Sequence, residues 1–152
     1  MIKSAYLDTS VYGGYFDEEF SERTVPFFER IIEDKIHIFT SKLLFAELAG
    51  APKEVRELLD EIPSNQKTTI ELTEEARFLA NKYIEEKVVG KTSLPDCQHI
   101  AMATLAKADV LVSWNFKHIV NLDRIRGYNG INLFLGYNQI EIRTPKEIEK
   151  YD

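Results

Sequence analysis

Four side chains with carboxylate or amide oxygens lie in or next to predicted strands and helices: Asp8, Glu47, Asp96 and Asn115. Asp8 and Asn115 each follow a short apolar segment, Asp96 begins a small-residue helical segment, and Glu47 lies inside an apolar one. Such oxygens are the ligands of hard cations such as Mg²⁺ and Mn²⁺, whereas Zn²⁺ prefers nitrogen and sulfur. If they converge, they could support phosphoryl transfer, in which a metal ion polarises a phosphate oxygen and activates water.

The segment 93–118 indicates why two of these groups should meet. About twelve helical residues, beginning near Pro95, carry the chain roughly 18 Å in one direction. About five residues of the strand that follows bring it roughly 17 Å back. Asp96, at the start of the helix, and Asn115, at the end of the strand, are therefore predicted to lie at one edge of the domain, where open α/β sheets bind their ligands.

The elements that position these groups alternate between strands and helices. Apolar and branched residues predict strands at 2–7, 36–40, 68–72, 110–112 and 139–143. Helical spacing of apolar residues predicts helices at 22–34, 42–49, 53–62, 73–88, 94–108 and 124–136. The alternation predicts an α/β fold of three layers, α/β/α, with a mostly parallel central sheet of four to five strands. Because the carboxyl ends of parallel strands share an edge, Asp8 and Asn115 should meet there, with Glu47 about two helical turns away.

Length and composition narrow the class of protein. A chain of 152 residues fits a single domain, predicted to span 1–152. Nineteen basic and twenty-five acidic residues give a net charge of −6, which argues against indiscriminate binding of nucleic acid but not against a nucleic-acid enzyme that binds metal. The sequence shows no signal peptide and no apolar run of membrane-spanning length. The single cysteine, Cys97, suits a reducing compartment, so a cytoplasmic protein is expected.

Some of these residues also have a plainer structural interpretation. Asp8 could simply cap the helix that follows it, and the hydroxyls of Thr9 and Ser10 could do the same. Glu47 could be an exposed carboxylate on the outer face of its helix, although its apolar neighbours then leave it needing solvent or a partner. The sequence alone leaves these alternatives open.

Four sequence segments occur in a recognisable order. They are LDTSVYGG with Asp8, SKLLFAELAGAP with Glu47, LPDCQHIAMATLAKADVLVSWN with Asp96, and SWNFKHIVN with Asn115. Together they resemble the PIN-domain ribonucleases, and most of all the VapC-type toxins of prokaryotic toxin–antitoxin pairs. The resemblance extends from residue 2 to about residue 148.

This resemblance implies a PIN-like fold and an endoribonuclease that binds Mg²⁺ or Mn²⁺ through Asp8, Glu47, Asp96 and position 115. Many family members have an acid at position 115, so Asn115 is a departure that removes one negative charge and should weaken the binding of a second metal ion. A PIN-like subgroup has the same WN followed by KHI, and Asn115 is therefore assigned as an auxiliary ligand or water-orienting group. In-line hydrolysis would leave a 5′-phosphate and a 3′-hydroxyl. The implied partners are an RNA substrate, a small antitoxin protein and a second copy of the chain.

Further contacts to RNA are assigned to Thr9, Ser10, His99 and Lys117. His99 lies three residues after Asp96, on the same face of its helix, where it could orient a site carboxylate, contact RNA or be a packed core residue. Lys117 could meet a phosphate or be a solvated surface lysine.

Two other functions remain open. A catalytically silent PIN-like module that binds RNA or protein would account for Asn115 and for the net charge of −6. An unrelated phosphotransfer domain would use Asp8 as its phosphate acceptor or nucleophile. It would need a lysine at the end of a late strand, where this chain has Trp114 and Asn115.

Overall fold

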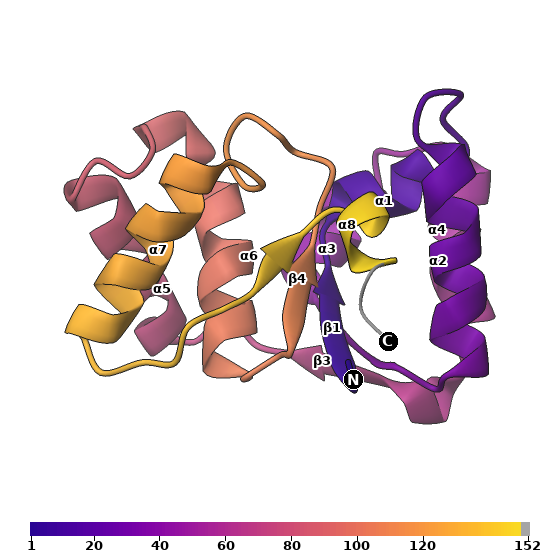
Figure 1. Ribbon diagram of the computed structural model, residues 1–152, viewed down its shortest axis with the longest axis horizontal. Helices are drawn as coiled ribbons and strands as arrows, with labels where there is room; N and C mark the ends of the chain where they lie inside the picture. The colour runs from indigo at the N-terminus through magenta and orange to yellow at the C-terminus, as the bar shows by residue number, and fades with distance from the viewer. Residues whose placement is uncertain (150–152) are drawn as a thin grey trace.

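A parallel sheet runs through the centre of the molecule, with helices on both of its faces (Figure 1). The computed structural model describes residues 1–149, so positions 150–152 of the predicted domain lie outside the described part. The strands are β1 (Ser4–Leu7), β2 (His37–Ser41), β3 (Lys67–Ile70), β4 (Val110–Val112) and β5 (Ile142–Arg143). Their order is β3-β2-β1-β4-β5, and every pairing is parallel. The prediction of a three-layer α/β/α fold is confirmed.

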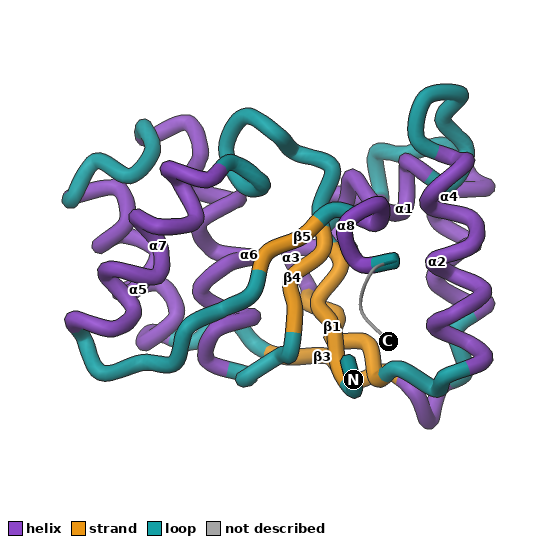
Figure 2. Tube along the Cα trace, viewed as in Figure 1, coloured by secondary structure: helices purple, strands orange, loops and turns teal. Residues whose placement is uncertain are grey.

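Alternation along the strands divides the core into two parts. Ala5 and Leu7 of β1 face one side of the sheet, and Tyr6 faces the other, because successive strand residues point to opposite faces. The side with Leu7 is covered by α1 (Thr9–Gly14), α2 (Ser21–Glu33), α3 (Lys42–Leu48), α4 (Lys53–Leu58) and α8 (Pro145–Ile148). The side with Tyr6 is covered by α5 (Glu74–Glu85), α6 (Leu94–Leu105) and α7 (Leu122–Phe134). Figure 2 shows the strands enclosed between these groups of helices.

Local capping chemistry sets several helix starts where the sequence predicts them. The Ser41 hydroxyl accepts the N–H of Leu44 at 3.1 Å, which begins α3 directly after β2. Thr73 accepts the N–H of Ala76 at 3.1 Å and begins α5 in the same way. The position of Glu47 on α3 therefore follows from a cap that fixes this helix to the end of its strand.

Several predicted boundaries are wrong at one end. The helices predicted at 73–88 and 94–108 end at Glu85 and Leu105. The helix predicted at 53–62 is α-helical only to Leu58 and continues as a 3₁₀ turn over Leu59–Glu61. The strand predicted at 139–143 is reduced to Ile142–Arg143. The side chain of Asn129 explains the shorter strand, because it bonds to both the N–H and the carbonyl of Ile140, at 2.7 and 2.9 Å. The backbone of Ile140 is thereby engaged by α7 rather than by the sheet.

The order of strands along the sheet reverses between β1 and β4, which makes this point the topological switch of the sheet. From β1 the chain proceeds to β2 and β3 on one side, then crosses the opposite face through α5 and α6 and enters β4 on the other side of β1 (Figure 1). In open α/β sheets, the carboxyl ends of strands at such a switch form a natural crevice for ligands. None of the helices within residues 1–149 is both long and apolar enough to span a membrane.

Candidate active site

Asp8 lies at this switch, directly after β1. Its side chain is 5% exposed, and its backbone N–H donates to the carbonyl of Val112 in β4 at 3.1 Å. Asp8 occupies the N-cap position of α1, but its carboxylate makes no capping hydrogen bond. Instead, Oδ1 accepts the Ser10 hydroxyl at 2.5 Å and Oδ2 accepts the Ser113 hydroxyl at 2.6 Å. The plainer interpretation of Asp8 as a side-chain cap is therefore wrong.

The two serines that hold Asp8 are themselves oriented by the backbone after β4. Ser10 Oγ accepts the N–H of Trp114 at 2.9 Å, and Ser113 Oγ accepts the N–H of Asn115 at 2.9 Å. Because each oxygen already receives a backbone hydrogen, each hydroxyl directs its own hydrogen to the Asp8 carboxylate. The carboxylate is thus fixed by one hydroxyl from α1 and one from the segment after β4.

Glu47 is held by a second set of partners. Its Oε1 accepts the Thr9 hydroxyl at 2.5 Å and lies 2.7 Å from Nε2 of His99. The Glu47 side chain is 31% exposed, whereas that of His99 is 2% exposed. Burial alone would raise the pKa of Glu47, but the hydrogen bond and charge of His99, together with the Thr9 hydrogen bond, lower it below its ordinary value. The carboxylate of Glu47 therefore has firm partners and is not merely a solvated surface group.

His99 is the middle of a hydrogen-bonded chain that leads back into the sheet. Its Nδ1 lies 2.5 Å from the hydroxyl of Tyr6, which in turn lies 2.8 Å from Ser41 Oγ. Nε2 of His99 donates to Glu47, because a carboxylate can only accept. The ring of His99 is consequently fixed between Glu47 and β1.

Asp96 begins the opposite wall of the site, in the first turn of α6. Asn115 Nδ2 lies 3.4 Å from Asp96 Oδ2, and Asn115 Oδ1 accepts the N–H of His118 at 2.9 Å. The His118 N–H can only donate, which fixes the amide orientation of Asn115. Sequence analysis assigns Asn115 as an auxiliary ligand, and here its nitrogen, not its oxygen, faces Asp96.

The acids share one electrostatic environment. Burial raises the pKa of Asp8, the hydroxyls of Ser10 and Ser113 oppose the rise, and the nearby charge of Asp96 adds to it. Burial also raises the pKa of Asp96, and Glu47 contributes to that increase. Carboxylates that repel one another in this way become more stable in their charged form when a cation lies between them.

The donor set fits a hard cation with few protein ligands. Within residues 1–149, no three acidic, histidine or cysteine side chains form a group that could hold a metal ion in the described geometry. A structural Zn²⁺ site requires four closely placed ligands. Mg²⁺, by contrast, keeps several waters and commonly takes one or two carboxylates together with substrate phosphate. Asp8 and Asp96, the pair that repel each other across the switch, suit this second arrangement.

Comparison with known proteins finds similar folds among solved structures. No family model and no curated protein matches the sequence. The structure of VapBC2 from Rickettsia felis, bound to a DNA fragment from its promoter, matches with a TM-score of 0.56 and 17% identity, covering 93% of this chain and 98% of that chain. The structure of FitAcB from Neisseria gonorrhoeae matches with a TM-score of 0.57 and 13% identity, with coverage of 93% and 98%. The chain has a PIN-like fold. The resemblance to VapC-type PIN proteins is thus confirmed in its fold.

Within this PIN-like fold, the residues assigned to RNA contact divide into two kinds. The hydroxyls of Thr9 and Ser10 and the ring of His99 are engaged with the site acids. Lys117, in the loop after Asn115, is exposed. The first three residues therefore hold the acids in place, and Lys117 is the one of the four directed to solvent.

Three residues of the candidate site are not predicted from the sequence. They are Tyr6, Ser41 and Ser113, which join the acids to the sheet through the hydrogen bonds described above. Strand alternation could have indicated Tyr6, because it precedes Asp8 by two residues and faces the same side of the sheet. Ser113 could have been indicated by its place directly after β4.

Proposed function

We propose that this chain is a metal-dependent endoribonuclease that hydrolyses RNA phosphodiester bonds. The observation that carries the proposal is that Asp8 and Asp96 are joined through Ser113 and Asn115 at the switch between β1 and β4. Burying carboxylates beside one another costs stability, so an arrangement that does this at a ligand-binding edge favours a metal-assisted reaction. The PIN-like fold supports the same assignment.

Asp8 and Asp96 would hold Mg²⁺ or Mn²⁺, with Glu47 as the third acid of the site. When bound, such an ion polarises the phosphodiester and lowers the pKa of water for in-line attack, which leaves a 5′-phosphate and a 3′-hydroxyl. The remaining roles belong to the chain itself. Ser10 and Ser113 fix the orientation of the Asp8 carboxylate. The residue at position 115 directs its amide N–H to Asp96, which makes it a positioning group in this proposal.

Glu47 is oriented so that one of its oxygens is engaged and the other is available. Glu47 accepts both of its hydrogen bonds, from the Thr9 hydroxyl and from Nε2 of His99, through Oε1. Among the described residues, Oε2 therefore has no competing hydrogen bond and can accept one from a bound water. Outer partners of this kind commonly affect metal affinity or activity by about 10- to 100-fold.

The proposal extends to a toxin of a toxin–antitoxin pair, with a small antitoxin protein and a second copy of the chain as partners. Support comes from the match to VapBC2, a structure that contains a DNA fragment from its promoter. The four sequence motifs resemble those of VapC-type toxins, which favours the same role.

Cleavage of single-stranded RNA in the presence of Mn²⁺ tests the proposal, comparing the wild type with Asp96→Asn. Asp123→Asn is a matched control, because Asp123 also lies in the first turn of a helix but is exposed. We expect cleavage by the wild type and the control and its loss in Asp96→Asn. Equal activity in all three proteins, or none in the wild type with Mg²⁺ or Mn²⁺, would overturn the proposal.

The second candidate is a catalytically silent module that binds RNA or protein. It is favoured by Asn115 at a commonly acidic position and by the net charge of −6. Calorimetric titration with Mn²⁺ separates the two functions. Saturable binding that is lost in Asp8→Ala favours the enzyme, and RNA or protein binding without any Mn²⁺ binding favours the module.

A further inference from the structure

An aromatic cluster of Phe20, Trp114 and Phe116 lies immediately beside the proposed active site. Trp114 stacks on Phe20 with ring centroids 4.5 Å apart and planes inclined by 25°. Phe116 lies 6.0 Å from Trp114 and 6.3 Å from Phe20 between centroids. Trp114 is 8% exposed and Phe116 is 51% exposed. The cluster thus consists of one buried ring, Trp114, one half-buried ring, Phe20, and one exposed ring, Phe116.

The cluster is fixed to the same segments that hold Asp8. Trp114 Nε1 donates to the Thr24 hydroxyl at 2.9 Å, and that hydroxyl donates to the carbonyl of Phe20 at 2.7 Å. The N–H of Trp114 donates to Ser10, which is a partner of Asp8. Gly14 makes room for the indole, since a Cβ at that position would lie 2.8 Å from two of its ring atoms. The aromatic rings are therefore built into the structure at a fixed place relative to the acids.

A cavity of about 700 Å³ opens next to these rings. Its lining includes Trp114 and Phe116, apolar residues of α7 and β5, and the charged residues Arg143, Lys146 and Glu147. Arg143 pairs with Glu141 at 2.6 Å, and Glu147 accepts the N–H of Thr144 in a capping box. Lys146 is exposed and forms no ion pair with the described residues. The volume lies within the range of roughly 300–1,000 Å³ that is usual for small-ligand sites.

The aromatic rings and the cations beside them suit an unpaired nucleotide. A ring can stack on its base, and a cation can pair with its phosphate. Bases of single-stranded nucleic acid stack on aromatic side chains, whereas bases within a duplex are already stacked and paired. Phe116 follows Asn115 directly along the chain, and its neighbour Trp114 is linked to Asp8 through Ser10. Lys117 and Lys146 supply positive charge in a chain whose net charge is −6.

We propose that Phe116, supported by Trp114, is a stacking subsite for a nucleobase of single-stranded RNA next to the bond to be cleaved. This inference rests on the proposed ribonuclease function and adds the side chains that would contact a base of the substrate. It also assigns Lys117 and Lys146 to the phosphates that flank the stacked base.

The test measures RNA binding in metal-free protein, where cleavage does not interfere. Trp114 is the single tryptophan of the chain, so its fluorescence reports directly on the cluster. The probes are one single-stranded oligoribonucleotide, its complete duplex, and an oligonucleotide of equal length that lacks bases. A fluorescent label on the RNA gives an independent affinity from anisotropy.

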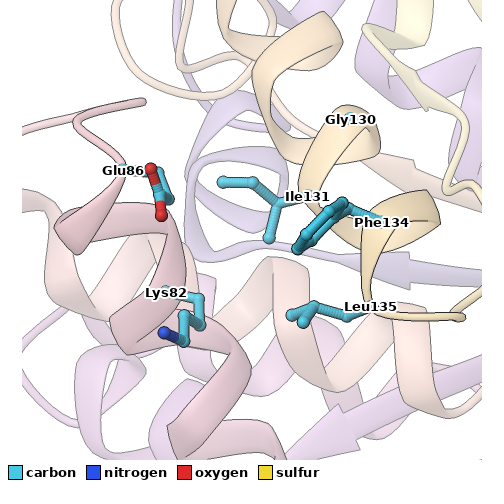
Figure 3. A pocket seen from close by; sticks show the side chains of 6 residues that line it. All are labelled: Lys82, Glu86, Gly130, Ile131, Phe134 and Leu135. Carbon is cyan, nitrogen blue, oxygen red and sulfur yellow. The ribbon is translucent and has the colours of Figure 1, made fainter.

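We expect the single strand to change the Trp114 emission, and the duplex and abasic probes to do so only weakly. Phe116→Ala should weaken binding of the single strand by about 5- to 100-fold, as is usual when a base loses its aromatic partner, and Phe116→Tyr should restore it. Phe134→Ala is the matched control. Phe134 is 89% exposed at the distant end of α7, and Figure 3 shows it with Ile131 and Leu135 at a separate pocket next to α5.

Each outcome separates this inference from the proposed function. Equal affinity of wild type and Phe116→Ala, or equal binding of the abasic probe, overturns the subsite even if the wild type cleaves RNA. Self-association that depends on Phe116, without a response to RNA, also overturns it and makes the surface an interface between copies. Base-dependent binding through Phe116 in a protein that cleaves no RNA supports the subsite and rejects the nuclease.

Discussion

Strands β1 and β4 pair with each other, and one aspartate lies at each end of the pair. The two aspartates differ in their hydrogen-bond partners and in their burial. Asp109 precedes β4, and its Oδ2 accepts the N–H groups of Lys3 and Ser4 at the start of β1, at 2.7 and 3.1 Å. Asp8 follows β1 at the carboxyl end. Its carboxylate accepts hydrogen bonds from two hydroxyls, and the charge of Asp96 raises its pKa. Asp109 is exposed, whereas Asp8 is buried.

This difference indicates that Asp109 stabilises the fold, whereas the charged form of Asp8 is unfavourable for it. Backbone N–H groups at a sheet end require acceptors, and Asp109 supplies one. Asp8 is desolvated next to a like charge, which is unfavourable in the absence of a cation. Groups that break the local rules for stability are expected at functional sites. The following experiments test whether the two aspartates differ as this comparison requires.

The largest difference is expected in RNA cleavage. Asp8→Asn should reduce the rate of Mn²⁺-dependent cleavage by at least about 100-fold, because the site loses a carboxylate that would stabilise a bound ion. Asp109→Asn should leave the rate unchanged. Initial rates on a labelled oligoribonucleotide measure both effects, and a similar loss in the two variants would show that the comparison is wrong.

A smaller effect is expected from the positioning histidine. His99→Gln should lower cleavage or Mn²⁺ affinity by about 10- to 100-fold, since Glu47 loses the ring that orients it. His37→Gln is a matched control, because the His37 ring hydrogen-bonds to Thr68, at 2.6 Å, near the other end of the sheet and not to a site acid. The same reduction in both variants would indicate general damage to the fold rather than loss of positioning.

The third effect concerns stability, and here the change at Asp109 should have the larger effect. Asp109→Ala should lower the free energy of unfolding by about 1 kcal/mol, because two N–H groups of β1 lose a charged acceptor but remain accessible to water. In a chain of this length that corresponds to a decrease of roughly 2–4 °C in Tm. Asp8→Asn should cause no such decrease in metal-free protein. Urea or thermal denaturation measures both variants, and greater destabilisation by Asp8→Asn would contradict the comparison.

The smallest effect is expected in the pH dependence of stability. Burial and the charge of Asp96 raise the pKa of Asp8 in the folded state above 3.8. The folded protein therefore binds this proton more tightly than the unfolded chain, and the stabilisation that the protonated group provides is lost as pH rises through the folded pKa. The free energy of unfolding of metal-free wild type, measured relative to Asp8→Asn, should fall as pH rises from about 4 towards neutrality. A rise over this range would show that Asp8 is stabilised in its charged form.

Short-range patterns in the sequence predict most of the framework. Ser41 and Thr73 begin their helices as expected, because a cap depends on residues three positions away. The positions of Asp8, Glu47, Asp96 and Asn115 follow from strands and helices whose ends meet at one edge. The strand at 139–143 is shorter than predicted because Asn129, on another element, takes the backbone of Ile140.

The sequence by itself determined the layered α/β arrangement and predicted the edge of the sheet at which the acids lie. Only the tertiary structure decided how each acid is held. Ser113 reaches Asp8 across 105 positions of the chain, and Tyr6 reaches His99 across 93. Local periodicity describes residues within a few turns, whereas the partner of a buried polar group depends on strand order and register. For the same reason, the structure alone shows that Asn115 turns its amide nitrogen, and not its oxygen, towards Asp96.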